Sequence, residues 1–393
     1  MVSASLTHRP LPWLIQRTSM KILINAINLT SAGTAATARA LFDVIHEVID
    51  GHELAVVVRQ DGGLRPEHAS PGVRWICYQP WTGPLYTCWR LWFDFRELPR
   101  LARMIGADAV FAMGNHLPGR YDVPATVLYR NPHYIEPDRD LSFAKRLEKQ
   151  LFARTVARRP KFIAQSEEMR RRLTTSWDVP SASIEVVANG LSADFLAGSV
   201  ARDGPASTDG IFRLLYVSRY YPHKNHEYLV ELAGRWKDFG SGKILLQCTV
   251  DPDSAPGRRL ASRARSLGVD DMIELLGELT SDELARRYRE ADALIFPSRM
   301  ETFGNPLLEA MAHGLPVLAA DRPYAHEICG DSALYFSLDR VDDARRKIEQ
   351  LRLEQNRYAD CSARGIERLS AFPSWREVAA SYLSIIEQSA ARP

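Results

Sequence analysis

Residues 293–317 read ALIFPSRMETFGNPLLEAMAHGLPV, and this stretch decides the fold class. The apolar run ending near Phe296 predicts a buried strand, while Asn305 and Pro306 are typical of a helix N-cap and a first-turn proline. The helix that they begin is expected to end near Gly314. The stretch therefore predicts one β-strand, a loop and one α-helix in succession.

Two carboxylates flank the start of this expected helix, Glu301 in the loop and Glu309 within the helix. Free backbone N–H groups at residues 303–305 and the positive end of the helix dipole would suit a diphosphate or sugar hydroxyls. Carboxylates accept hydrogen bonds from hydroxyls but not from phosphate oxygens. The segment therefore indicates a ligand that carries both phosphate and hydroxyl groups.

The same alternation of strand and helix extends over the rest of the chain. It predicts an α/β protein with two parallel-sheet, Rossmann-like domains. The strands expected are residues 21–26, 54–58, 74–78, 109–112, 125–129, 161–164, 184–187, 212–217, 244–249, 273–275, 293–296 and 317–318. The run ARDGPASTDG at residues 201–210 has the composition of a linker. Ligands of such folds bind where the carboxyl ends of the strands meet, here in a cleft between the domains.

Four segments follow from this pattern. They are a flexible N-terminal extension (1–19), a first domain (20–200), a second domain (201–372) and a C-terminal helix (373–393). Met20 stands directly before the first strand, so translation starting there is the alternative to an extension.

Composition excludes several classes of protein. The 393 residues carry 50 Lys and Arg against 48 Asp and Glu, a balance too even for a nucleic-acid binder that acts through its overall charge. Five widely spaced cysteines without a C-x-x-C pair favour a reducing compartment, so we expect a cytoplasmic protein. No apolar run approaches the ~20 residues that a membrane-spanning helix needs.

Glu301 and Glu309 form the E-x7-E pattern of the retaining, nucleotide-sugar-dependent glycosyltransferases of family 4, which have the GT-B fold, and the chain resembles that family. LLYVSRYYPHKN at 214–225 is similar to the family's strand and Arg-x4-Lys pair, and LGELTSDEL at 276–284 to its loop beside the donor base. Asn189-Gly190 and residues 375–386 also match. In the first domain only the opening strand, the Gly33 loop and a later histidine match. The resemblance implies two domains facing each other across a cleft, with the C-terminal helix packing back towards the first. It also implies that the first domain (20–200) lies on the acceptor side and that the second (201–372) binds the nucleotide sugar.

The resemblance also implies roles for individual residues. Arg219 and Lys224 would hold the donor diphosphate and stabilise the charge that develops on the leaving nucleotide. Glu301 would accept hydrogen bonds from the donor sugar, and Glu309 from the ribose. The catalytic set is Glu301, Arg219, Lys224 and His116. The donor-binding set is Gly33, Arg219, Lys224, Leu279, Thr302, Phe303, Gly304, Asn305 and Glu309.

Plainer explanations exist for several of these residues. An Arg-x4-Lys pair is often only a solvated helix start, and Gly33 is equally well an ordinary turn glycine. His133, in RNPH at 130–133, competes with His116 for the position near the donor sugar. The E-x7-E pattern in the following motif favours the functional interpretation of Arg219 and Lys224.

The sequence predicts neither a metal site nor a cofactor besides the nucleotide-sugar donor. Asp251-Pro-Asp253 copies a metal-binding D-x-D pattern, but it is interpreted as a polar loop. His223 and His226 lack further ligands to complete a coordination shell. The chain has no G-x-S-x-G or P-loop pattern, which argues against two large enzyme classes.

Two stretches of the first domain are candidates for acceptor contact. Six aromatic residues gather between Trp81 and Phe95, as core or as an apolar surface for lipid. Residues 139–161 carry eight basic residues and an apolar stripe at Phe143, Leu147 and Leu151, as in a basic amphipathic helix. Such a helix is either a solvated surface helix or a contact with an anionic membrane, on the inner face of the cell membrane.

The expected function is transfer of a sugar, with retention of configuration, from a nucleoside-diphosphate donor to a saccharide or lipid-linked acceptor hydroxyl. The resemblance implies a role in cell-surface polysaccharide synthesis, such as O-antigen or capsule, with a mannosyltransferase as one candidate. An epimerase or phosphorylase on the same scaffold is a rival, because fold does not determine function. A catalytically silent nucleotide-sugar-binding scaffold protein is a rival from another class.

Overall fold

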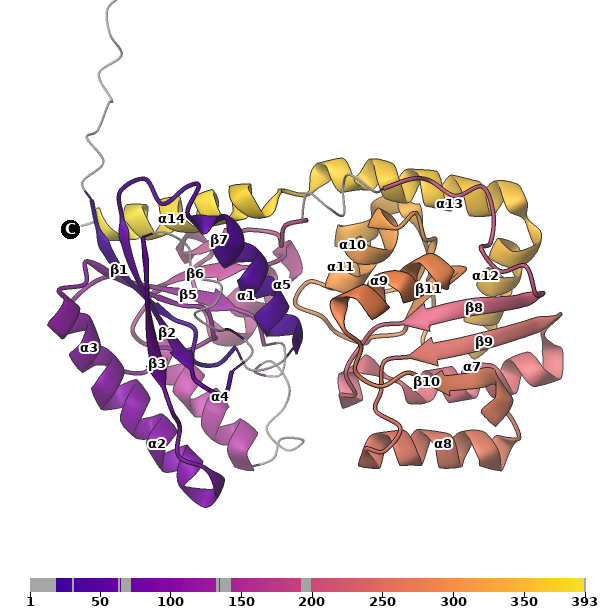
Figure 1. The fold of residues 1–393 in the computed structure, drawn as a ribbon, viewed down its shortest axis with the longest axis horizontal. Coiled ribbons are helices and arrows are strands. Elements are labelled where there is room, and N and C mark those ends of the chain that lie inside the picture. Colours follow the sequence, from indigo (N-terminus) through magenta and orange to yellow (C-terminus); the bar gives the residue numbers. More distant parts are fainter. Residues whose placement is uncertain are drawn as a thin grey trace, which may run out of the picture.

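The computed structural model describes residues 19–29, 32–62, 64, 72–131, 134, 143–191 and 199–391. Figure 1 shows two α/β domains side by side, each with helices around a central sheet. Both sheets are parallel throughout their described pairings. The predicted fold class is confirmed.

The first domain has a seven-stranded sheet in the order β3-β2-β1-β4-β5-β6-β7. Its strands are β1 (Lys21–Asn25), β2 (Glu53–Arg59), β3 (Val73–Tyr78), β4 (Ala109–Ala112), β5 (Ala125–Tyr129), β6 (Lys161–Ala164) and β7 (Ile184–Val186). Its helices are α1 (Ala32–Ile45), α2 (Tyr86–Trp92), the π-helical turn η3 (Phe93–Glu97), α3 (Leu98–Ile105), α4 (Phe143–Val156) and α5 (Glu167–Trp177). Helices cover the sheet, which is why its central strands are apolar on both faces.

The second domain has a six-stranded sheet in the order β10-β9-β8-β11-β12-β13. Its strands are β8 (Ile211–Tyr216), β9 (Lys243–Cys248), β10 (Ile273–Leu275), β11 (Ala293–Phe296), β12 (Val317–Ala320) and β13 (Ala333–Phe336). Its helices are α7 (Glu227–Phe239), α8 (Ala255–Leu267), α9 (Ser281–Glu290), α10 (Asn305–Ala312), α11 (Pro323–Cys329), α12 (Val341–Leu353) and α13 (Gln355–Arg368). Strand β13 is an addition to the strands that the sequence predicted.

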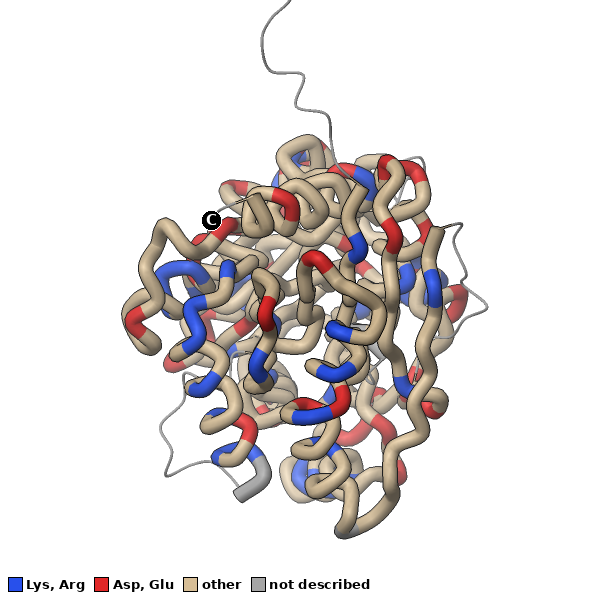
Figure 2. Tube along the Cα trace, turned by 90° about the vertical axis from the view of Figure 1, so that its left-hand side faces the viewer, with Lys and Arg blue, Asp and Glu red and all other residues tan. Residues whose placement is uncertain are grey.

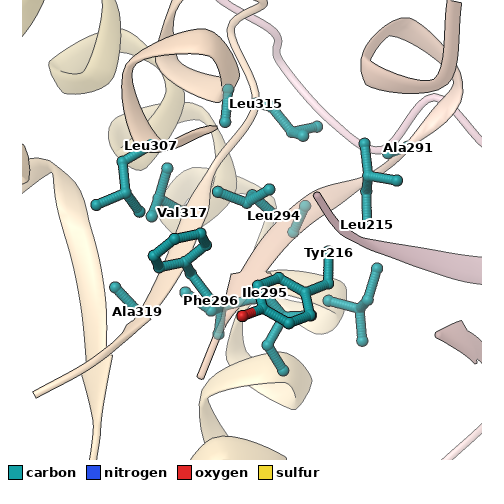
Figure 3. Close-up of a cluster of buried hydrophobic side chains, with 14 of the residues drawn as sticks. Leu215, Tyr216, Ala291, Leu294, Ile295, Phe296, Leu307, Leu315, Val317 and Ala319 are labelled. Carbon is teal, nitrogen blue, oxygen red and sulfur yellow. The ribbon is translucent and has the colours of Figure 1, made fainter. Parts of the chain in front are cut away.

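The core of the second domain lies around β8, β11 and β12. Figure 3 shows side chains such as Tyr216, Phe296 and Leu307 packed against one another there. Tyr216 and Phe296 meet edge to face, with 5.5 Å between ring centroids. This packing gives β8 and β11 a rigid base, and the loops that follow these strands carry the candidate site residues.

The last helix, α14 (Trp375–Ala390), returns to the first domain, as predicted. It runs along the top of the first domain in Figure 1 and contacts α1, β4 and β5, and Tyr382 meets Phe111 with 5.6 Å between ring centroids. Gly190 makes the crossing possible, because a Cβ there would lie 2.7 Å from the backbone nitrogen of Trp375. The helix thus joins the two domains through apolar contacts.

In the part of the chain that the structure describes, no helix is both long enough and apolar enough to span a bilayer.

Candidate active site

Lys224 and Glu301 are the two predicted site residues that the structure brings into contact. They follow β8 and β11, which are neighbours in the sheet, so their loops emerge at the same edge. The Lys224 Nζ lies 2.6 Å from each carboxylate oxygen of Glu301. The Lys224 side chain is 20% exposed and that of Glu301 is 8% exposed. The pair is therefore largely shielded from water, which strengthens its attraction.

Hydrogen bonds between the two loops hold this pair in place. The His223 carbonyl accepts from the backbone N–H of Arg299 at 2.8 Å. Asn225, in the left-handed region at φ 59°, donates through Nδ2 to the Pro297 carbonyl at 3.3 Å. Two buried tyrosines, which the sequence reasoning missed, support the loops from below. Tyr216 donates to the Lys224 carbonyl and Tyr324 to the Ser298 carbonyl, both at 2.7 Å.

Arg219 lies in the same loop after β8 as Lys224, but it pairs with Glu278 and not with Glu301. Its guanidinium donates to the Glu278 carboxylate at 2.6 Å, with side-chain exposures of 44% and 70%. Glu278 and the half-buried Leu279 belong to the loop between β10 and α9, the loop predicted to lie beside the donor base. The structure therefore places this loop next to Arg219.

The prediction that Asn305 caps α10 is wrong. The N-cap is Gly304 at φ 108°, a conformation that a residue with a side chain rarely adopts, and Asn305 is the first helical residue. The Asn305 side chain is engaged elsewhere. Its Oδ1 accepts from Asn189 of the first domain at 2.7 Å, and its Nδ2 lies 3.5 Å from the Thr37 hydroxyl. In this first turn Pro306 has no N–H, and the Leu307 N–H donates to the Gly304 carbonyl at 2.9 Å, which leaves the Asn305 N–H as the backbone donor at the helix start.

Thr302 and Phe303 lie between Glu301 and this helix start. The Phe303 side chain is buried against Phe372, so Phe303 has only its backbone to offer to a ligand. The Thr302 carbonyl accepts from the Ser166 hydroxyl at 2.9 Å. Since Ser166 follows β6 of the first domain, the carboxyl ends of strands from both sheets meet here.

Glu309 lies on α10 and points towards α9. Its Oε2 accepts from the Tyr288 hydroxyl at 2.7 Å. Burial raises the pKa of Glu309, and the hydrogen bond from Tyr288 opposes this shift. Its recorded hydrogen bonds do not include Lys224, Arg219 or Glu301, so the E-x7-E pair forms two separate acceptor positions.

Gly33 lies in the first turn of α1 and not in the loop that the sequence predicted. Residues 30–31 lie outside the described part of the chain. Because the first four N–H groups of a helix have no partner within it, Gly33 still offers a backbone donor.

His116 is buried in the first domain, with 6% of its surface exposed. Its Nε2 lies 3.8 Å from Asp94, which pairs with Arg90 through both carboxylate oxygens. Burial, assisted by the charge of Arg90, lowers the pKa of His116 to about 3. His116 is therefore neutral near pH 7. Its competitor, His133, lies outside the described residues.

Glu327 of α11 makes a contact between the domains that the sequence did not predict. Its two oxygens accept from the backbone N–H groups of Glu167 and Glu168, at 2.6 and 3.1 Å. The carboxylate thus occupies the N-terminus of α5 in the first domain, a favourable place for negative charge. Nothing in the local sequence around Glu327 marks this role, because the contact depends on how the domains meet.

Among the described residues, no group of three or more His, Cys, Asp or Glu side chains is placed to hold a metal ion. In the D-x-D segment, Asp251 accepts from the backbone N–H of Asp253 at 2.9 Å, and Ser254 caps α8. The segment forms the turn into a helix.

Several solved structures share this architecture. The Anabaena protein HepE in complex with UDP-glucose has a TM-score of 0.70 and 17% identity, covering 93% of this chain and 99% of that chain. WaaG, described as a glycosyltransferase involved in lipopolysaccharide biosynthesis, has a TM-score of 0.63 and 15% identity, covering 94% of this chain and 98% of that chain. These likenesses define the class by fold: two Rossmann-like domains of the GT-B type.

Two family models cover most of the chain. The model for group 1 glycosyl transferases matches residues 202–368, and the model for Glycosyltransferase Family 4 matches residues 33–195. The chain belongs to the family 4, group 1 glycosyltransferases.

Curated relatives agree with this assignment. The O-antigen chain mannosyltransferase RfbU of Salmonella typhimurium is 29% identical over 51% of this chain. The D-inositol 3-phosphate glycosyltransferase of Actinosynnema mirum is 27% identical over 69% of this chain. The matched segments span 54% of the length of RfbU and 72% of the length of the second relative.

Proposed function

We propose that this glycosyltransferase transfers a sugar from a nucleoside-diphosphate donor to a hydroxyl of a saccharide or lipid-linked acceptor, with retention of anomeric configuration and without a metal ion. The observation that carries the proposal is the shielded Lys224–Glu301 pair beside the open helix start at Gly304. One cation, one carboxylate and the backbone N–H of Asn305 lie together where strands of both domains end. This combination suits a ligand with phosphate and hydroxyl groups.

When the donor binds, Lys224 leaves Glu301 and contacts the diphosphate. The Arg219 side chain rotates away from Glu278 and contacts the diphosphate as well, because phosphate oxygens form strong charge-assisted hydrogen bonds with both cations. Glu301, released from Lys224, accepts from hydroxyls of the donor sugar. Glu309 accepts from the ribose, with Tyr288 fixing its carboxylate. The backbone donors of Gly33 and of the α10 start, together with Leu279, complete the donor site.

The chemistry requires no protein nucleophile. The bond from the anomeric carbon to the diphosphate oxygen breaks, and the acceptor oxygen bonds to the same face of that carbon. The acceptor proton passes to the departing phosphate oxygen, which balances the charge. Lys224 and Arg219 stabilise the negative charge on the leaving group, and neutral His116 completes the sugar side of the site.

Relatives support a role in cell-surface polysaccharide synthesis. RfbU is named as an O-antigen chain mannosyltransferase, and WaaG by its part in lipopolysaccharide biosynthesis. We therefore propose a lipid-linked or polysaccharide acceptor of that kind, with mannose first among the donor sugars to try.

We further propose a cytoplasmic enzyme that rests on an anionic membrane through its first domain. Leu151 of α4 is buried, so the apolar stripe expected of that helix packs inward at this position. The exposed apolar surface lies instead at Trp81, Leu85 and Trp92, which are 52%, 58% and 44% exposed. Figure 2 shows basic positions spread over several helices on this side of the molecule, with acidic positions among them.

Vesicle sedimentation tests the membrane proposal separately from the chemistry. Binding should rise with anionic lipid, fall with salt and weaken when Trp81 and Trp92 are changed to Ser. Equal binding by this variant and the unchanged protein would remove Trp81 and Trp92 as the contact.

Calorimetry with a panel of nucleoside diphosphates and their sugars, in the presence of EDTA, tests the donor proposal. One nucleotide should bind to the unchanged chain and at least about tenfold more weakly to the Lys224→Ala variant. Binding of no nucleotide, or equal binding by both proteins, would contradict it.

A further inference from the structure

The first domain holds a surface hollow in which three of the five lining residues are arginines. Its volume is about 390 Å³, and its lining is Phe95, Arg120, Arg154, Ala157 and Arg158. These residues come from η3, the loop between β4 and β5, the end of α4 and the turn after it. The hollow shares no residue with the candidate active site.

The π-helical turn places an aromatic ring at this hollow. Helices α2 and α3 run on through η3, whose extra width changes which side chains face outward. Asp94 turns into the core and pairs with Arg90, while Phe95 faces the hollow. The guanidinium carbon of Arg154 lies 5.5 Å from the centroid of the Phe95 ring. The aromatic face therefore holds Arg154 in a defined orientation.

The remaining two arginines add charge that no nearby carboxylate neutralises. Arg158 donates through Nε to the Pro118 carbonyl at 3.0 Å, which orients the group and leaves its terminal nitrogens available. Within the described residues, neither Arg120, Arg154 nor Arg158 forms an ion pair with an acid. Asp94, next to Phe95 in the chain, uses both oxygens on Arg90.

Three guanidinium groups around one hollow repel one another unless an anion lies between them. Their planar, forked donors match the oxygens of a phosphate group in pairs. We propose that this arginine hollow binds a phosphate-bearing anion at a site separate from the donor site. Two sources share this chemistry, a soluble phosphate or diphosphate and the headgroup of an anionic lipid.

Pyrophosphate, titrated calorimetrically into the full chain, is the first probe. The titration uses the Lys224→Ala background, so that weakened donor-site binding does not obscure the signal. Changing Arg154 and Arg158 to Gln should weaken pyrophosphate binding at least about tenfold. The matched control, Arg103→Gln on the exposed face of α3, should leave it within about twofold. Arg154→Gln alone, which breaks no recorded hydrogen bond, serves if the double variant fails to fold.

Phosphatidylcholine vesicles with and without phosphatidic acid form the second arm. Loss of pyrophosphate binding with unchanged sedimentation supports a soluble phosphate ligand, and loss of sedimentation on phosphatidic acid supports a lipid headgroup. If the arginine variants match Arg103→Gln in both arms, the proposal is overturned. Because the donor site is weakened in every protein compared, this outcome does not depend on whether the transfer reaction is correctly assigned.

Discussion

Changing Lys224 to Ala tests the geometry of the candidate site at two levels, turnover and stability. Lys224 holds both oxygens of Glu301 at 2.6 Å, and Glu301 is 8% exposed. Removal of the cation leaves this carboxylate shielded and without its partner. Breaking a fully buried pair costs about 3–5 kcal/mol, but Lys224 is 20% exposed, so we expect a loss of about 1–3 kcal/mol in the free energy of unfolding.

Turnover should fall even where the variant is fully folded, because Lys224 is proposed to contact the leaving group. If Lys224 stabilises charge on the leaving diphosphate, kcat/KM should fall at least about tenfold, or ~1.4 kcal/mol of transition-state stabilisation. Arg219→Ala is the matched control for stability. Its partner Glu278 is 70% exposed, so it should cost less than about 1 kcal/mol of stability while lowering turnover similarly.

Two measurements on both variants and on the unchanged protein separate the loss of stability from the loss of turnover. They are urea unfolding and the rate of nucleoside-diphosphate release. Circular dichroism confirms that each variant is folded under assay conditions. Unchanged turnover in folded Lys224→Ala would refute the assignment of this residue to the donor diphosphate. Equal stability losses in the two variants would refute the argument from burial.

Three further outcomes are expected. Glu309→Ala should lower donor turnover at least about tenfold, while Tyr288→Phe, which keeps the carboxylate, should lower it much less. Equal losses in the two variants would contradict a direct contact between Glu309 and the ribose. Transfer should survive EDTA, and loss that Mn²⁺ or Mg²⁺ restores would show that Asp251 or another group binds a required metal. Burial lowers the pKa of His116 to about 3 and that of His226 to about 4, so the unfolded chain binds protons near pH 5 that the folded chain does not, and stability falls as pH drops below about 6.5. Near pH 5 each histidine should lower the free energy of unfolding by about 2 kcal/mol, and His116→Gln should remove the part of this pH dependence that His116 causes. A His116→Gln variant whose stability depends on pH as much as that of the unchanged protein would contradict this.

Local patterns predicted the strands because most of them are short apolar runs bounded by polar turns. Strand β13 was missed because Ala333–Phe336 is only four residues long and directly follows a Gly-Asp-Ser segment. It also lies at the edge of the sheet, where a strand needs a less pronounced apolar pattern than a central strand does. The other errors concern helix starts. Gly33 was expected in a loop but lies in the first turn of α1. Asn305 was expected to be the N-cap of α10, but Gly304 occupies that position.

The candidate site was predictable as a set of residues but not as a set of contacts. Spacing and family resemblance identified Lys224 and Glu301, yet their direct pairing depends on β8 and β11 being neighbours, which is a property of the whole sheet. The side chain of Asn305, which was expected to cap α10, accepts a hydrogen bond from Asn189, more than a hundred residues earlier in the chain. Glu327 acts across the domain boundary in the same way. Such partners are set by tertiary packing, and local sequence carries no signal for them.

Nuclear magnetic resonance of the product distinguishes retaining sugar transfer from inversion, epimerisation and simple donor binding. The purified protein is incubated in EDTA with the nucleotide sugar that binds best and with a panel of saccharide and lipid-linked acceptors. We expect release of nucleoside diphosphate together with a new glycosidic bond that has the anomeric configuration of the donor. A product of inverted configuration, an epimerised donor with no acceptor modified, or no nucleotide release above that of the Lys224→Ala variant would contradict it.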